Sequence, residues 1–220
     1  MKKLTGYISL AVILGLLIYD TSFLLKDNKA QTSIRAPQST KMASIVRLLR
    51  PGGATFCTGT VITPTTILTA AHCVSQEVAP GFVMMNRDPI EIRLDDNLPI
   101  GVLATPYGVR VQFDQALLQG DFSKFKPRKF TADIKELILA AHSSEGFVSC
   151  GYPMGGHLFC TSMLFKNYEG FMWAASGVLI PGMSGGPTLA SDGSVVATNV
   201  AVEKDFSVIS PVYNLDQDIK

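Results

Sequence analysis

The segment that most constrains this chain is Pro181-Gly182-Met183-Ser184-Gly185-Gly186-Pro187. Three glycines and two prolines in seven residues exclude a regular helix or strand here. Glycine allows positive φ and a close approach of other backbone, which suits a serine nucleophile flanked by backbone N–H groups that hold an oxyanion. A flexible loop with an incidental serine is the alternative, because G-x-S-x-G alone is a weak signal.

The rest of the chain predicts short strands. Residues 43–49 and 55–63 are rich in β-branched side chains, with Pro51-Gly52-Gly53 between them. Closely spaced strands with scattered proline and glycine indicate an all-β chain, and the one plausible helix before the middle of the chain is a turn at residues 70–74. In the second half we expect strands at residues 134–137, 146–149, 161–165, 171–177 and 195–202. Asp192-Gly193 predicts a hairpin turn before the last of them.

Chain order separates the two enzyme classes that use a nucleophilic serine between glycines. An α/β-hydrolase needs its histidine after the serine. The three histidines, His72, His142 and His157, all precede Ser184, so that class is excluded. The order His, Asp, Ser is met by His72, Asp114 and Ser184, and the spacings between them are 42 and 70 residues.

These three residues lie in the segments Thr69-Ala70-Ala71-His72-Cys73, Asp114-Gln115-Ala116-Leu117 and Gly182-Met183-Ser184-Gly185-Gly186-Pro187. Together the segments resemble the signatures of the trypsin/chymotrypsin-like serine proteases, over residues 42–215. Residues 57–62 and 192–199 are closer to bacterial HtrA-type and glutamyl-endopeptidase-like members than to digestive trypsins.

The resemblance implies two antiparallel six-stranded β-barrels with the active site in the cleft between them. His72 and Asp114 would come from the first barrel and Ser184 from the second. His72 would act as the base and Asp114 would orient it, while the N–H groups of Gly182 and Ser184 hold the oxyanion. The expected substrate is a protein or peptide, with no metal or cofactor. A non-catalytic homologue that binds a partner, or a tethered structural protein, are the alternatives.

Two departures from digestive members are informative. Met183 stands where those enzymes carry an aspartate, and no Ile-Val-Gly-Gly start is visible, so we expect a preformed oxyanion hole. Val178 stands where trypsin carries the aspartate that selects Lys or Arg, and Asn199 stands where glutamyl endopeptidases carry histidine. We therefore expect an apolar residue on the acyl side of the scissile bond. The specificity pocket is expected to be lined by Val178, Leu179, Asn199, Val200 and Val202.

Four cysteines in an exported chain predict two disulfides, with three possible connectivities. In the resembled family, the positions of Cys57 and Cys73 are bridged, which leaves Cys150 and Cys160 to pair across a hairpin. A zinc site built from His142, Cys150, His157 and Cys160 is the rival interpretation, but its spacing fits no compact ligand pattern.

The N-terminal segment predicts export. Lys2-Lys3 precede about a dozen apolar residues, which is the length of a signal-peptide core, since a spanning helix needs roughly 18 or more. We expect residues 1–25 to be a signal peptide or a retained membrane anchor (residues 7–25), and residues 26–41 to be a polar tether. Residues 42–220 are the expected protease domain, with barrels at 42–125 and 131–220. The net charge of +1 gives no indication of nucleic-acid binding, and we expect a monomer.

Overall fold

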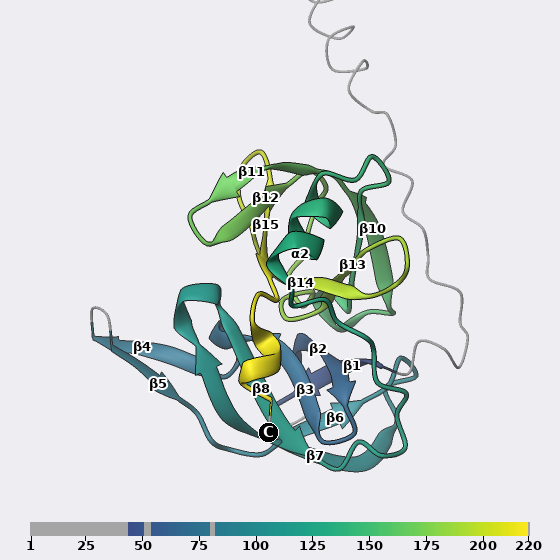
Figure 1. The fold of residues 1–220 in the computed structure, drawn as a ribbon. Helices are drawn as coiled ribbons and strands as arrows, with labels where there is room; N and C mark the ends of the chain where they lie inside the picture. The colour runs from purple at the N-terminus through teal and green to yellow at the C-terminus, as the bar shows by residue number, and fades with distance from the viewer. Residues whose placement is uncertain (1–43, 51–53, 80–81, 220) are drawn as a thin grey trace, which may run out of the picture. The chain divides into compact units, whose positions relative to one another are not determined.

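Two β-sheets make up most of the computed structural model, which describes residues 44–50, 54–79 and 82–219 (Figure 1). The N-terminal apolar segment, the tether and the turn at residues 51–53 lie outside the described residues. No helix among those described is long and apolar enough to cross a membrane.

The first sheet is a closed antiparallel barrel that forms the lower half of Figure 1. Its strands follow the order β1-β2-β3-β8-β7-β6, and β1 closes the barrel by pairing with both β2 and β6. The strands are β1 (Ile45–Leu49), β2 (Thr55–Thr63), β3 (Thr66–Ala70), β6 (Ile90–Arg93), β7 (Pro99–Arg110) and β8 (Gln115–Gly120). The predicted helical turn is confirmed as the 3-10 turn Ala71–Cys73 after β3.

The second sheet has seven strands in the order β10-β9-β13-β14-β15-β12-β11. They are β9 (Phe147–Gly151), β10 (Phe159–Met163), β11 (Phe165–Glu169), β12 (Met172–Ala175), β13 (Pro187–Leu189), β14 (Val195–Val202) and β15 (Ser207–Pro211). The outer strands β10 and β11 are separated only by Leu164, so the sheet must curl until its two ends meet. If β10 and β11 are counted as one bent strand, this half has the expected six.

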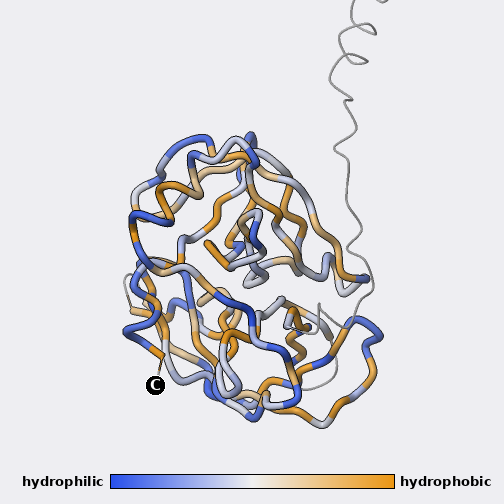
Figure 2. Tube along the Cα trace, turned by 45° about the vertical axis from the view of Figure 1, so that its right-hand side comes forward, coloured by the Kyte–Doolittle hydropathy of each residue, from blue (hydrophilic) through white to orange (hydrophobic). Residues whose placement is uncertain are grey.

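Several strands of the barrel are apolar along their whole length because both of their faces are buried. In β1, Val46 and Leu48 belong to the cluster inside the barrel, whereas Ile45 joins the core of the second half. In β8, Leu118 and Leu117 divide in the same way. Apolar stretches accordingly run through both halves of the molecule (Figure 2). The second core centres on aromatic side chains such as Phe147 and Trp173, whose rings stack at 5.7 Å.

The expected strand at residues 134–137 is wrong, because these residues begin the helix α2 (Ile134–Ala141). The Asp133 side chain caps this helix by accepting hydrogen bonds from the N–H groups of Lys135 and Glu136. Leu137 and Ala141, four residues apart, lie on the buried face. The predicted hairpin at Asp192-Gly193 is confirmed, because it joins β13 to β14.

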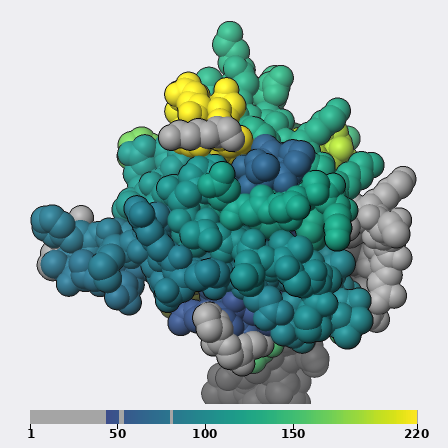
Figure 3. All heavy atoms as spheres, turned by 90° about the horizontal axis from the view of Figure 1, so that it is seen from below, coloured from purple at the N-terminus to yellow at the C-terminus, as the bar shows by residue number. Residues whose placement is uncertain are grey.

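A separate hairpin, β4 (Ser75–Ala79) and β5 (Phe82–Met85), follows the 3-10 turn. It projects from the side of the barrel, as the space-filling view shows (Figure 3). Its pairing is local, since neither strand joins the barrel or the second sheet. Val78, Phe82 and Met84 are exposed on it.

Candidate active site

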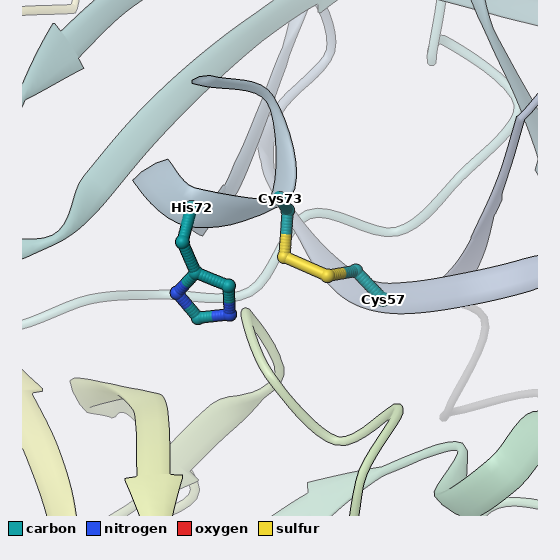
Figure 4. Close-up of side chains that lie close together, drawn as sticks. All are labelled: Cys57, His72 and Cys73. Carbon is teal, nitrogen blue, oxygen red and sulfur yellow. A yellow bond between two sulfur atoms is a disulfide. The ribbon is translucent and has the colours of Figure 1, made fainter. Parts of the chain in front are cut away.

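His72 lies in the 3-10 turn that follows β3, at the edge of the barrel. Its side chain is 47% exposed. The next residue, Cys73, is joined to Cys57 by a disulfide, and Figure 4 shows the imidazole beside this bridge, directed toward a loop of the second half. The disulfide ties the turn to β2 and thereby limits where the imidazole can lie.

Asp114 binds His72 through both carboxylate oxygens. Its Oδ1 accepts a hydrogen bond from the backbone N–H of His72 at 2.8 Å, and its Oδ2 lies 2.6 Å from His72 Nδ1. Asp114 immediately precedes β8 and has a left-handed conformation with φ 45°. The Asp114 side chain is 17% exposed, so the carboxylate is less open to water than the imidazole that it contacts.

Ser184 lies in the loop before β13. The backbone N–H of Thr58 donates to the Ser184 carbonyl at 2.8 Å, which joins this loop to the barrel. Ser184 Oγ donates to the carbonyl of Val200 at 3.2 Å. No hydrogen bond joins Ser184 Oγ to His72 within the described part of the chain. Such contacts are often long in the absence of substrate and tighten when it binds.

The N–H groups of Gly182 and Ser184 donate to no acceptor among the described residues, and the adjoining carbonyls explain why. In a trans peptide the N–H points opposite to the C=O. The Pro181 carbonyl accepts from the N–H of Met154 at 2.6 Å, which turns the Gly182 N–H the other way. The Met183 carbonyl accepts from Gly186 N–H at 3.0 Å, which orients the Ser184 N–H in the same manner.

This loop requires glycine at Gly182 and Gly185. Both have positive φ, 97° and 81°. A Cβ on Gly182 would collide with the backbone of Tyr152 and Met154, and one on Gly185 with the backbone of Thr58. Burial raises the pKa of Tyr152, whose hydroxyl donates to the Ile45 carbonyl and so holds this neighbouring segment against the barrel.

Met183 is fully buried in the core of the second half. It packs so closely on Gly151 that a Cβ added there would lie 2.7 Å from the Met183 Cα. The residue that replaces the aspartate of digestive members therefore anchors the loop by apolar packing.

The residues predicted for the specificity pocket separate into two groups. Val178 and Val202 are 48% and 50% exposed, and Val200 is half-buried beside Ser184. Leu179 is buried.

The expectation for Asn199 needs correction, because this residue is 0% exposed. Its Nδ2 donates to the carbonyls of Cys150 and Met183, and its Oδ1 accepts from Thr188 Oγ1. All of its amide atoms are bonded internally, so it supports the Ser184 loop from behind and presents no group to a substrate.

The second disulfide joins Cys150 to Cys160, which are directly opposite in β9 and β10. Their sulfur atoms are therefore not thiolate ligands for zinc. His142 packs against Phe165, and His157 lies 3.6 Å from Asp95. Disulfides are typical of proteins outside the cytoplasm.

The sequence model described as a trypsin-like peptidase domain matches residues 57–197. The chain belongs to this family. It is accordingly a serine endopeptidase, a hydrolase of peptide bonds. A comparison with curated proteins finds no match.

Solved structures of bacterial-type serine proteases are similar to this trypsin-like peptidase. A Glu endopeptidase is 17% identical, with a TM-score of 0.63, over 85% of this chain and 93% of its own. The serine endoprotease from Yersinia pestis is 15% identical, with a TM-score of 0.61, over 83% and 65%. The active form of the Rv3671c protease from M. tuberculosis is 19% identical, with a TM-score of 0.55, over 78% and 77%. At these identities the likeness concerns the fold alone, and it confirms the predicted chymotrypsin-like double barrel.

Proposed function

We propose that this endopeptidase works through His72, Asp114 and Ser184, with the oxyanion held by the N–H groups of Gly182 and Ser184. The contact of both Asp114 carboxylate oxygens with His72 carries the proposal. That contact keeps the proton on Nδ1 and leaves Nε2 free to accept the proton of a serine hydroxyl. The two N–H groups without acceptors in the described chain add the electrostatic part of the site.

The reaction begins when Ser184 Oγ exchanges its hydrogen bond to the Val200 carbonyl for one to His72. His72 accepts the hydroxyl proton as Oγ bonds to the peptide carbonyl carbon. The carbonyl oxygen becomes an oxyanion between the two N–H groups. His72 then gives the proton to the leaving amine as the C–N bond breaks, and water hydrolyses the acyl-enzyme by the same route.

The test is covalent labelling of the oxidised full-length chain with a fluorophosphonate probe. Wild-type protein is expected to label, and Ser184→Ala and His72→Ala are expected not to. All three should show the same thermal unfolding transition, so that loss of labelling reports chemistry rather than misfolding. Labelling that persists in Ser184→Ala would contradict the assignment of the nucleophile.

We also propose a preference for an apolar residue on the acyl side of the scissile bond. The support is that Val178 and Val202, the exposed residues among those expected to line the specificity pocket, carry no charge. Because Asn199 is buried and fully bonded, it offers no polar group to a substrate. Chromogenic peptides ending in Val, Ala or Leu should be cleaved with higher kcat/KM than Arg or Glu peptides. The reverse order would contradict this preference.

We also propose that the protein is exported. Residues 1–25 would be a signal peptide or an anchor, residues 26–41 a tether, and residues 42–220 a monomeric protease domain. Both disulfides support folding outside the cytoplasm. Membrane fractionation together with N-terminal sequencing of the mature protein separates a cleaved peptide from a retained anchor. Mature protein that remains in the cytoplasm would contradict export.

A further inference from the structure

Thr58, in β2 of the barrel, makes four hydrogen bonds around the Ser184 loop while it is itself completely buried. Its hydroxyl donates to the Gly182 carbonyl at 2.7 Å and accepts from the N–H of Tyr152 at 3.0 Å. Its own N–H donates to the Ser184 carbonyl, and its carbonyl accepts from Thr69 Oγ1 at 2.8 Å. Thr58 therefore holds the loop at both residues whose N–H groups face the oxyanion.

The hydroxyl of Thr58 bonds the carbonyl of a loop peptide whose only backbone hydrogen bond, within the described chain, is through its N–H group. This peptide joins Gly182 to Met183, and its N–H donates to the Ile180 carbonyl at 2.9 Å. The Gly182 carbonyl on its other side is bonded by Thr58 Oγ1. Gly182 has the freedom of a glycine, so its ψ is held by these two bonds together, one at each end of the peptide.

The same hydroxyl also positions the segment that orients the Gly182 N–H. Tyr152, whose N–H donates to Thr58 Oγ1, lies two residues before Met154, and the Met154 N–H in turn holds the Pro181 carbonyl. The peptide after Gly182 is therefore bonded directly to Thr58 Oγ1. The peptide before Gly182 is connected to the same oxygen indirectly, through Tyr152 and Met154.

We propose that the Thr58 side chain is a positioning residue for the oxyanion hole: it sets the direction of the Gly182 N–H from across the interface between the two halves. The inference rests on the proposed catalytic function of Ser184. Thr58 does not touch the substrate, and its effect passes through the Gly182 backbone. Because Thr58 belongs to the barrel, the oxyanion hole would form only when the barrel is docked against the Ser184 loop.

The matched variants are Thr58→Val, Thr58→Ser and Thr60→Val. Valine preserves the shape of Thr58 and its backbone bond to Ser184 but removes the hydroxyl, whereas serine keeps the hydroxyl. Thr60 lies two residues further along β2 and is equally buried, and its hydroxyl has no partner among the described residues. Thr60→Val therefore controls for the loss of a buried hydroxyl from the same strand.

We measure kcat and KM of the full-length chain on a peptide with an apolar acyl-side residue. Removing one oxyanion donor outright lowers kcat about 10²–10³-fold, so a misdirected donor in Thr58→Val should lower it about 10–100-fold. KM should stay within about threefold, because the interaction is made in the transition state. A peptide boronate forms an anionic adduct that occupies the oxyanion hole. In Thr58→Val its Kd should rise by the same factor by which kcat/KM falls. Thr58→Ser and Thr60→Val should retain wild-type kcat within about threefold.

A wild-type kcat in folded Thr58→Val would overturn the inference alone, as would an equal loss in Thr60→Val. If wild-type protein neither labels with fluorophosphonate nor cleaves peptides, the proposed function fails and this inference fails with it. If Thr58→Val does not fold, Thr58→Ala replaces it with the same expectation. Its thermal transition, measured beside the kinetics, separates loss of oxyanion binding from loss of fold.

Discussion

Replacing Asn199 by alanine removes three buried hydrogen bonds from behind the Ser184 loop. The amide donates to the carbonyls of Cys150 and Met183 at 2.9 and 3.2 Å and accepts from Thr188 Oγ1 at 2.9 Å. At about 1 kcal/mol each, these bonds amount to about 3 kcal/mol, and the cavity left by the amide adds to the cost. We expect the free energy of unfolding to fall by about 3–4 kcal/mol.

For a domain of this size, that loss corresponds to a Tm lower by about 6–16 °C. Thermal unfolding of the oxidised protein, followed by circular dichroism, measures it. The neighbouring Thr198 provides the control, since its buried hydroxyl has no hydrogen-bond partner among the residues described. Thr198→Val should leave Tm unchanged or raise it. A decrease below about 2 °C in Asn199→Ala would refute the assignment of Asn199 to loop support.

Three further predictions concern aspartates. Asp114→Asn should lower kcat about 10³–10⁴-fold with little change in KM, because an amide donating to Nδ1 moves the His72 proton to the wrong nitrogen; steady-state kinetics measures it, and a loss below tenfold would contradict the assigned role. The pKa of Asp192 is lowered by hydrogen bonds from the Ser194 side chain and N–H, so its stabilisation is present above about pH 4 and lost as pH falls through the lowered pKa. Urea midpoints between pH 6 and pH 2 should therefore fall less in Asp192→Asn than in wild type, and parallel curves would exclude this contribution. Asp133→Ala should lower the free energy of unfolding by about 1 kcal/mol through loss of the helix cap, whereas Asp133→Asn should retain it; equal urea midpoints for the two variants would contradict capping.

Local signals in the sequence were sufficient for several strands, among them β1, β2 and β14. Asp192-Gly193 predicted its hairpin because the turn chemistry is contained in two residues, and Gly193 has the positive φ that the turn requires. The helix α2 was not predicted from residues 134–137, because four residues are too few to show the spacing of one helical face. The available signal was the pair Asp133 and Glu136, an N-cap followed three residues later by an acid, with Leu137 and Ala141 spaced for one helical face.

The residues that support the site, Thr58 and Asn199, could not be predicted from local sequence signals. Thr58 is separated by 124 residues from Gly182 and by 94 from Tyr152, and nothing in the Cys57-Thr58-Gly59 sequence indicates those partners. Asn199 follows an apolar run in β14. The pattern of that run does not indicate which face of the strand the Ser184 loop covers. Family signatures indicated the residues that we propose to react, whereas the residues that hold them depend on how the two halves dock.

Met183 determines how the Ser184 loop is stabilised in this chain. An aspartate at this position would be a buried charge and would need a cationic partner before the loop could be stable. Met183 needs none, because it is fully buried in an apolar cluster and lies against Gly151. The loop can therefore take its final conformation when the second half folds and the barrel supplies Thr58. We infer that formation of the proposed oxyanion hole is coupled to folding and docking of the two halves rather than to a later charge pairing.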